Sequence, residues 1–199
     1  AGADADNGDG ELFYTLDTLP VHGTLFLNGT PFLTAGGAFT QADVAAGFVI
    51  YTHDGSETFS DSLAVSLSDG NSTTALTTLE LTVTPVNDAP MLSISAATVS
   101  EGATVVLSAA NLAGADVDNT NPQLTYTLGA APVRGVLELN GIALTANATF
   151  TQDDVNNGRV SYTHDGSETF SDSLAVDLGD VNSTTALTTL ELTVTPVND

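Results

Sequence analysis

Two long stretches of this chain occur twice with identical letters. Tyr51–Val65 (YTHDGSETFSDSLAV) recurs at Tyr162–Val176, and Asn71–Asp88 (NSTTALTTLELTVTPVND) recurs at Asn182–Asp199. Solenoid repeats recur roughly every 20 to 50 residues, and the spacing here is more than twice the longest of these. We therefore expect two copies of one whole domain, each large enough to bury a core of its own. Near-identical tandem domains usually build length, which favours a structural array.

The phase of the repeat leaves one segment without a counterpart. Ala1–Asn7 (AGADADN) aligns with Ala113–Asn119 (AGADVDN), so Ala89–Leu112 occurs only once. We expect domains at residues 1–88 and 89–199, the first without its N-terminal strand, in a slice of a longer repeat array. The strand-like run in the unmatched segment is 104–109. The alternative, in which 89–112 folds back and completes the first copy, is open at this point.

The charge of the chain excludes several classes of function. Its formal net charge is −23, because the chain has 25 acidic residues and only two basic ones, Arg134 and Arg159. Such a chain cannot neutralise phosphates, so we expect neither nucleic-acid binding nor attachment to an anionic membrane. No run approaches the roughly 20 apolar residues of a membrane-spanning helix. Self-repulsion opposes the compact state, which indicates either bound divalent cations or a saline environment. There is no cysteine, hence no disulfide and no thiolate metal site.

Period-two alternation indicates an all-β chain. Leu79, Leu81 and Val83 alternate with polar residues, and several short runs of this kind separated by turns predict antiparallel β-sandwiches. Asn28-Gly29 reads as a two-residue hairpin turn, because both residues accept a positive φ. The stretch 40–44 (TQADV) predicts a single capped helical turn. Residues 84–90, with two prolines, predict a short and rather rigid linker.

The acidic residues gather at the ends of the expected strands. Asp116-x-Asp118-Asn119 places two carboxylates on one side of an extended segment. Ca²⁺ binds six to eight oxygens from carboxylates, amides and carbonyls, so this pattern favours calcium. An EF-hand does not fit, because the spacing of Asp and Gly around Asp4 and Asp6 is wrong and no helices flank them.

The order of these motifs resembles a cadherin-like domain. The sequence runs from Asn87-Asp88 through Glu101-Gly102, Asp116-x-Asp118-Asn119 and His164-Asp165-Gly-Ser-Glu168 to Leu174-x-Val176-x-Leu178-x-Asp180. More narrowly, it is similar to the cadherin-like repeats of very large bacterial surface adhesins and of chondroitin sulfate proteoglycan-type proteins. The resemblance implies seven-stranded Greek-key β-sandwiches of the cadherin or immunoglobulin type, with Ca²⁺ at the junctions between them.

The resemblance also implies which residues bind the ions at each junction. At the junction within this chain they are Asp54, Glu57, Asn87, Asp88, Asp116, Asp118, Asn119 and Asp180. At the following junction they are Glu101, Asp165, Glu168, Asn198 and Asp199. At the preceding junction they are Asp4, Asp6, Asn7 and Asp69. Two residues separate Asp54 from Glu57, where a cadherin has one between the matching acids, which is a departure from the family pattern.

Two functions compete. The leading hypothesis is a non-enzymatic extender in a cell-surface or secreted protein, in which neighbouring repeats of the same chain are the partners and calcium stiffens the junctions. The alternative is a module that binds a carbohydrate or protein ligand of the cell surface or matrix. No constellation supports an enzyme: His53, Asp54 and Ser56 are too close along one strand to form a triad, because adjacent residues point to opposite faces. His53 and His164 are expected to serve packing.

Overall fold

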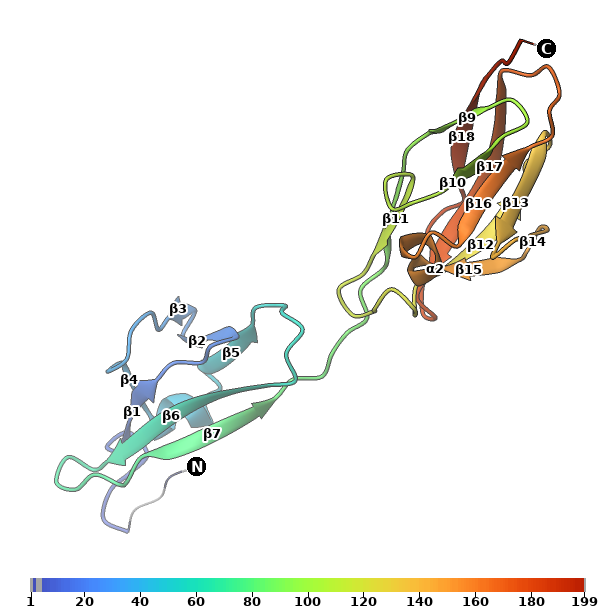
Figure 1. Cartoon of the computed structure of the whole chain (residues 1–199). Helices are drawn as coiled ribbons and strands as arrows, with labels where there is room; N and C mark the ends of the chain where they lie inside the picture. Colours follow the sequence, from blue (N-terminus) through green and yellow to red (C-terminus); the bar gives the residue numbers. More distant parts are fainter. Residues whose placement is uncertain (1, 3–4, 199) are drawn as a thin grey trace. The chain divides into compact units, whose positions relative to one another are not determined.

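The computed structural model describes residues 2 and 5–198, and consists of β-strands with two one-turn helices (Figure 1). The chain divides into two compact units, Ala1–Val86 (unit 1) and Asn87–Asp199 (unit 2). No helix among the described residues has the length and apolar character needed to cross a membrane. The all-β fold predicted from the alternation is confirmed.

Unit 1 is built from two antiparallel sheets. One has the order β4-β1-β6-β7 and the other the order β3-β2-β5. The strands are β1 (Phe13–Thr18), β2 (Gly23–Leu27), β3 (Thr30–Pro31), β4 (Ala38–Thr40), β5 (Val49–His53), β6 (Ser60–Ser68) and β7 (Thr77–Thr82), with helix α1 at Gln41–Ala45. The chain passes from β1 to the other sheet at β2 and returns from β5 to β6, so apolar side chains of both sheets meet between them.

Unit 2 repeats this arrangement with the same connections. Its matching elements are β12 (Thr125–Ala130), β13 (Gly135–Leu139), β14 (Ile142–Ala143), β15 (Thr149–Thr151), α2 (Gln152–Asn156), β16 (Val160–His164), β17 (Ser171–Gly179) and β18 (Thr188–Thr195). Four further strands precede them: β8 (Met91–Ile94), β9 (Ala97–Ser100), β10 (Thr104–Val106) and β11 (Leu112–Ala115).

The segment without a counterpart pairs with strands of unit 2. Strand β9 runs parallel to β18, with Leu192 opposite Ala97 and Val194 opposite Val99. Strand β10 runs antiparallel to β16, and β8 pairs with β11. The prediction of a single strand at 104–109 is wrong, because the segment holds β8, β9 and β10, and β10 ends at Val106. The turn between β9 and β10 is made by Gly102, whose φ of 67° favours glycine.

Local signals in the sequence fold as predicted. Asn28 and Gly29 have φ angles of 50° and 77° and join β2 to β3, where Leu27 pairs with Thr30. Thr40 caps α1, because its hydroxyl accepts from the Asp43 N–H at 3.0 Å while the Asp43 carboxylate accepts from the Thr40 N–H at 2.8 Å. Both expectations are confirmed, and each depends only on neighbours within four residues.

The cores of the two units differ in size. Four buried hydrophobic residues form the core cluster described for unit 1, namely Leu16, Leu25, Phe39 and Leu63. Eighteen form the corresponding cluster of unit 2, and β9 and the segment after β10 contribute Ala97, Val99, Leu107 and Leu112 to it. The additional strands of unit 2 therefore close its core.

Candidate metal centre

Asn87 joins the start of unit 2 to the turn after β17. Its side-chain N–H donates to Asp180 Oδ2 at 2.8 Å, and its side-chain oxygen accepts from Asn182 Nδ2 at 2.7 Å. Asp180 is buried, with 1% of its surface exposed, and its Oδ1 accepts from the backbone N–H groups of Asn182 and Ser183. These contacts hold the first residues of unit 2 against a buried carboxylate.

Asp88 joins the same place to the loop after β11. Its backbone N–H donates to Asp118 Oδ2 at 2.6 Å. Asp116 shapes this loop, because its Oδ1 accepts from the N–H groups of Asp118 at 2.8 Å and Asn119 at 2.9 Å. We call Asn87, Asp88, Asp116, Asp118, Asn119 and Asp180 the N-terminal acidic cluster of unit 2. Three segments that are far apart in the sequence form it.

Two oxygen atoms of the N-terminal acidic cluster are buried without a hydrogen-bond partner: Asp116 Oδ2 and Asn119 Oδ1. Buried polar atoms in native structures nearly always have a partner, so each exception points to a missing water or ion. Both atoms are acceptors, and the cluster offers only carboxylate, amide and backbone oxygens. That donor set fits a hard cation such as Ca²⁺ and does not fit the nitrogen and sulfur preference of zinc.

Asp180 is ionised at neutral pH. Hydrogen bonds from the Asn87 side chain and from the Ser183 N–H lower its pKa to about 2, since they stabilise the charged form. An ionised carboxylate is the state that a cation ligand needs, and no proton has to be displaced from Asp180 before a cation binds.

A second group of candidates lies at the other end of unit 2. Glu101 Oε2 accepts from the Val197 N–H at 3.1 Å, and a Cβ built on Gly102 would lie 3.9 Å from the Cα of Gly166. The Glu101-Gly102 turn therefore lies beside the loop that carries Asp165 and Glu168, whose side chains are exposed. Ser167 Oγ in this loop is buried without a hydrogen-bond partner. Asn198 is exposed, and Asp199 lies outside the described residues.

The candidates of unit 1 lie at opposite ends of β6. Asp54 precedes β6 and accepts from the Ser56 N–H at 2.9 Å; hydrogen bonding from the side chain and the backbone of Ser56 lowers the pKa of Asp54. Glu57 follows it and is exposed. Asp69 follows β6 and accepts from Ser72 and Asn71, which also lowers its pKa. Asp6 is exposed and Asn7 half-buried, and Asp4 lies outside the described residues. The structure does not bring Asp54 and Asp69 together.

Sequence reasoning missed Asn182. Its side chain supports Asn87, because Asn182 Nδ2 donates to the Asn87 side-chain oxygen. A signal was present, because Asp180-x-Asn182-Ser183 is an Asx turn in which Asp180 accepts two backbone N–H groups. The contact with Asn87, distant in the sequence, carries no local signal.

His164 is a buried residue that connects two loops. Its ring is buried, Nδ1 accepts from the N–H groups of Gly102 and Gly166 at 3.3 and 3.2 Å, and Nε2 contacts Thr169 Oγ1 at 3.0 Å. These contacts assign the proton to Nε2, since Nδ1 acts as an acceptor. The ring therefore joins the Gly102 turn to the Asp165 loop.

The sequence matches a known family over nearly its whole length. The model of the family described as cadherin-like matches residues 1–83 and 90–194. The chain belongs to the cadherin-like family. The resemblance to cadherin-like domains that its motifs indicate is therefore confirmed at the level of the family.

Several curated proteins of animals are relatives. Human FRAS1-related extracellular matrix protein 1 is 34% identical over 170 residues, which are 83% of this chain and 8% of that protein. Extracellular matrix protein 3 of Lytechinus variegatus is 33% identical over 195 residues, 88% of this chain and 6% of the relative. Human chondroitin sulfate proteoglycan 4 is 32% identical over 166 residues, 79% of this chain and 7% of the relative. The chain thus spans less than a tenth of these relatives, and the predicted link to bacterial adhesins finds no support among them.

Solved cadherin structures share the fold. Human mucin-like protocadherin EC1-2 aligns with a TM-score of 0.51 at 16% identity, covering 94% of this chain and 85% of that one. Mouse cadherin-23 EC22-24 aligns with a TM-score of 0.51 at 15% identity, covering 100% of this chain and 58% of that one. The predicted tandem of cadherin-like sandwiches is confirmed.

Proposed function

We propose that this chain is a non-enzymatic structural module of a large extracellular or cell-surface protein. Its near-identical repeats set length, and neighbouring repeats of the same chain are its first partners. The duplication of Tyr51–Val65 and Asn71–Asp88 supports a spacer, because a single specialised binding site does not require both repeats to have the same surface residues. The names of the matrix-protein relatives support an extracellular location. We place the repeats at 1–88 and 89–199, in line with the family matches at 1–83 and 90–194.

We further propose that the N-terminal acidic cluster of unit 2 binds Ca²⁺. The observation that carries this is the pair of buried, unpartnered oxygens, Asp116 Oδ2 and Asn119 Oδ1. Asp88, Asp118 and Asp180 add carboxylates, and Asn87 and Asn182 orient the buried carboxylate of Asp180. Bound Ca²⁺ would neutralise part of the repulsion among these acids. By the same family pattern, Asp54 and Glu57 complete this junction.

The outer ends of the chain would repeat this chemistry. We propose Glu101, Asp165 and Glu168 as ligands at the end of unit 2, where Ser167 Oγ is the unpartnered buried atom. Asp6 and Asp69 would serve the start of unit 1. At each of these ends the adjoining repeat is expected to supply the remaining oxygens, as the family pattern implies.

Calcium should raise the melting temperature of the chain. Binding to the folded state alone stabilises it by RT ln(1 + [L]/Kd), which is about 2.7 kcal/mol at a hundredfold excess of ion over Kd. Calorimetry in chelator, in millimolar Ca²⁺ and in NaCl of equal ionic strength separates ion binding from general screening. An identical melting temperature in all three solutions contradicts the proposal, whereas a rise that NaCl reproduces indicates adaptation to salt.

A double variant locates the effect. Asp116→Ala with Asp118→Ala should remove most of the calcium-dependent rise at the unit 2 transition. Asp177→Ala with Glu191→Ala is the matched control, because it removes the same charge from strands β17 and β18 and should keep the rise. Equal loss in both double variants would mean that net charge, and not the cluster, is responsible.

Calcium should also restrict the linker between the two repeats. Without the ion, like charges at the junction repel, and the hinge is the segment 83–86, which lies between the end of β7 and the anchored Asn87; with it, ligands from both repeats would be joined. Small-angle scattering should show a narrower distribution of lengths in Ca²⁺ than in chelator. Identical scattering curves would contradict the stiffening of the array by calcium, although the module could still bind the ion.

A further inference from the structure

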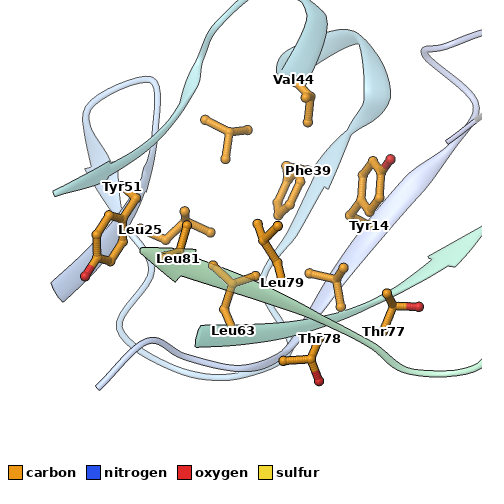
Figure 2. Close-up of a pocket in the computed structure, with 12 residues that line it drawn as sticks. Tyr14, Leu25, Phe39, Val44, Tyr51, Leu63, Thr77, Thr78, Leu79 and Leu81 are labelled. Carbon is orange, nitrogen blue, oxygen red and sulfur yellow. The ribbon is translucent and has the colours of Figure 1, made fainter. Parts of the chain in front are cut away.

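The outer face of the sheet β3-β2-β5 in unit 1 is apolar. Leu25 and Tyr51 line the space between the two sheets (Figure 2). Adjacent residues of a strand point to opposite faces, so Phe26 and Ile50 point to the outer face. Phe26 lies opposite Pro31 on β3 and opposite Ile50 on β5, and both of these neighbours are exposed. The three side chains therefore form an apolar row across the sheet.

Phe48 extends this row along the sheet. It lies two residues before Ile50, hence on the same face, and its carbonyl accepts from the Asn28 N–H at 3.0 Å. Side chains that are diagonally opposite on neighbouring strands come within reach of each other when one is aromatic. Phe48 is 45% exposed and Ile50 is 53% exposed. We call Phe26, Pro31, Phe48 and Ile50 the outer apolar face of unit 1.

Unit 2 has no large apolar residue at the four matched positions, which are occupied by Glu138, Ala143, Arg159 and Ser161. The strand pairing is the same, because Glu138 lies opposite Ala143 and Ser161. The core-facing neighbours are kept as Leu137 and Tyr162. Thr24, whose counterpart is Val136, changes in the opposite direction. The fold of the repeat therefore does not require the outer apolar face.

The strands that precede the matched part of unit 2 leave its outer face open. Strands β9 and β10 lie beside β18 and β16, and Val136 on the outer face remains 42% exposed. In unit 1, Phe26 lies on the middle strand of its sheet, with a strand on either side. Strands placed like β9 and β10 would thus widen the sheets of unit 1 without covering the outer apolar face.

The same part of unit 1 carries almost no charge. Residues 18–53 contain one acid, Asp43, and no Arg or Lys. The Asp43 carboxylate belongs to the cap of α1, where it accepts from the Thr40 N–H at 2.8 Å. The matched residues of unit 2 contain five charged side chains, namely Arg134, Glu138, Asp153, Asp154 and Arg159. In a chain with a net charge of −23, this face is an uncharged exception.

We propose that the outer apolar face of unit 1 binds the same face of a second copy of the chain. A two-fold contact needs a surface that is complementary to itself, and an uncharged row with Phe26 at its centre meets that need. Like charges elsewhere disfavour other approaches of two copies. A cationic partner is drawn to the acids and not to this face. The contact requires no metal and is separate from the calcium proposal.

Two magnitudes set the expected strength of this contact. Packed sheets lie roughly 10 Å apart and the Debye length is about 8 Å at physiological ionic strength, so acids on the opposite sheet are largely screened at the contact. A stable interface buries about 800 Å² on each partner, which is more than four side chains supply. One pair of chains therefore associates weakly, and linked repeats would strengthen the association by raising the effective concentration.

Sedimentation equilibrium of the whole chain in chelator, between roughly 10 μM and 1 mM, tests the contact. We expect a reversible monomer–dimer equilibrium that NaCl strengthens, because salt screens the repulsion. Phe26→Glu with Ile50→Ser introduces the residues of unit 2 and should weaken dimerisation at least about tenfold. Leu76→Glu with Phe59→Ser is the matched control, because these side chains are 59% and 73% exposed outside the outer apolar face. The control should dimerise like the unchanged chain.

The methyl signals of isoleucine locate the contact. The chain has three isoleucines: Ile50 lies on the outer apolar face, while Ile94 and Ile142 lie on β8 and β14 of unit 2. Raising the protein concentration should shift the Ile50 methyl signal and leave the other two unchanged. The Phe26→Glu change alone should abolish the concentration dependence of the Ile50 signal.

Three results would overturn the proposal. The first is a monomer over the whole concentration range. The second is a dimer that survives Phe26→Glu with Ile50→Ser but is lost in Leu79→Glu, which would place the contact at the space between the sheets of unit 1. The third is a dimer that forms only with Ca²⁺, which would mean that the ion bridges acids of two copies.

Discussion

The two units differ in what surrounds the same sequence. Leu79 and Leu190 stand in identical surroundings, LTTLELTVTPVND, yet the first is 52% exposed and the second fully buried. The strands also differ in length: β7 ends at Thr82, whereas β18 continues to Thr195, two residues beyond the position that matches Thr82. Those two further residues, Val194 and Thr195, pair with Val99 and Ser100 of β9. Burial and strand length are therefore set here by a neighbouring strand and not by the local sequence.

Matched truncations should separate the two units most strongly. Leu190→Ala should lower the free energy of unfolding of unit 2 by about 3 kcal/mol, because it opens a cavity in a closed core. Leu79→Ala should cost unit 1 less than about 1 kcal/mol, because half of that side chain is already in solvent. Urea unfolding followed at each unit measures both. Equal costs would mean that Leu79 is as buried in solution as Leu190.

A second pair of residues should behave alike in both units. Asp61 accepts from the N–H groups of Val21 and His22 and from the Tyr51 hydroxyl, and Asp172 accepts from Val133, Arg134 and Tyr162 in the same way. Asp61→Asn and Asp172→Asn should each cost about 2 kcal/mol, because buried charge-assisted hydrogen bonds are lost. Asp17→Asn, at an exposed position, is the control and should change stability by less than about 0.5 kcal/mol. Unequal costs would show that the missing strands disturb unit 1 as far as Asp61.

Acid should weaken the Asp61 anchor. Burial acts to raise the pKa of Asp61, but the hydrogen bonds from the Val21 N–H and the Tyr51 hydroxyl outweigh it, so the pKa lies below its ordinary value. A lowered folded pKa contributes stability that is present above about pH 4 and is lost as pH falls through the folded value. Unit 1 should therefore lose this contribution in acid, and Asp61→Asn should flatten that part of the profile. Thermal melting between pH 5 and pH 2 checks the shape.

The smallest effect concerns one turn that differs between the units. Val181 has a φ of 96° and is 95% exposed, while its counterpart Gly70 has a φ of 90°. A β-branched residue is strained at such a φ and glycine is not. Val181→Gly should stabilise unit 2 by about 1 kcal/mol, and Gly70→Val should destabilise unit 1 by about 1 kcal/mol. Melting of the two variants checks the signs, and a loss of stability in Val181→Gly would contradict the account.

Much of the fold could be predicted from the sequence where the signals are local. The Asn28-Gly29 turn and the Thr40 cap depend on residues a few positions apart, and the alternation around Leu81 predicts a strand without its partner. The parallel pairing of β9 with β18 depends on a segment roughly ninety residues away in the chain, and nothing near either strand specifies it. The short strands β8 and β9 were missed for a different reason, because a run of 4 residues carries little periodicity.

In the candidate site, too, some features follow from the local sequence and others depend on how distant segments fold together. Asp116-x-Asp118-Asn119 is recognisable in the sequence because its residues are adjacent, and the family pattern adds Asp88 and Asp180. That Asn87 binds Asp180, and that Asn182 supports Asn87, follow from how the ends of unit 2 fold together. Which oxygens are left without a partner, Asp116 Oδ2 and Asn119 Oδ1, depends on the three-dimensional arrangement of all these groups.

Amide hydrogen exchange of the whole chain in chelator tests the central claim most directly, namely that 89–112 completes unit 2 and leaves unit 1 open. The nearly identical sequences of the compared segments supply their own control, because intrinsic exchange rates are nearly equal at matched positions. We predict faster exchange at 49–53 and 77–82 than at 160–164 and 188–193, since among the described residues no strand pairs with the outer edges of β5 and β7. Slower or equal exchange in unit 1 would contradict the account.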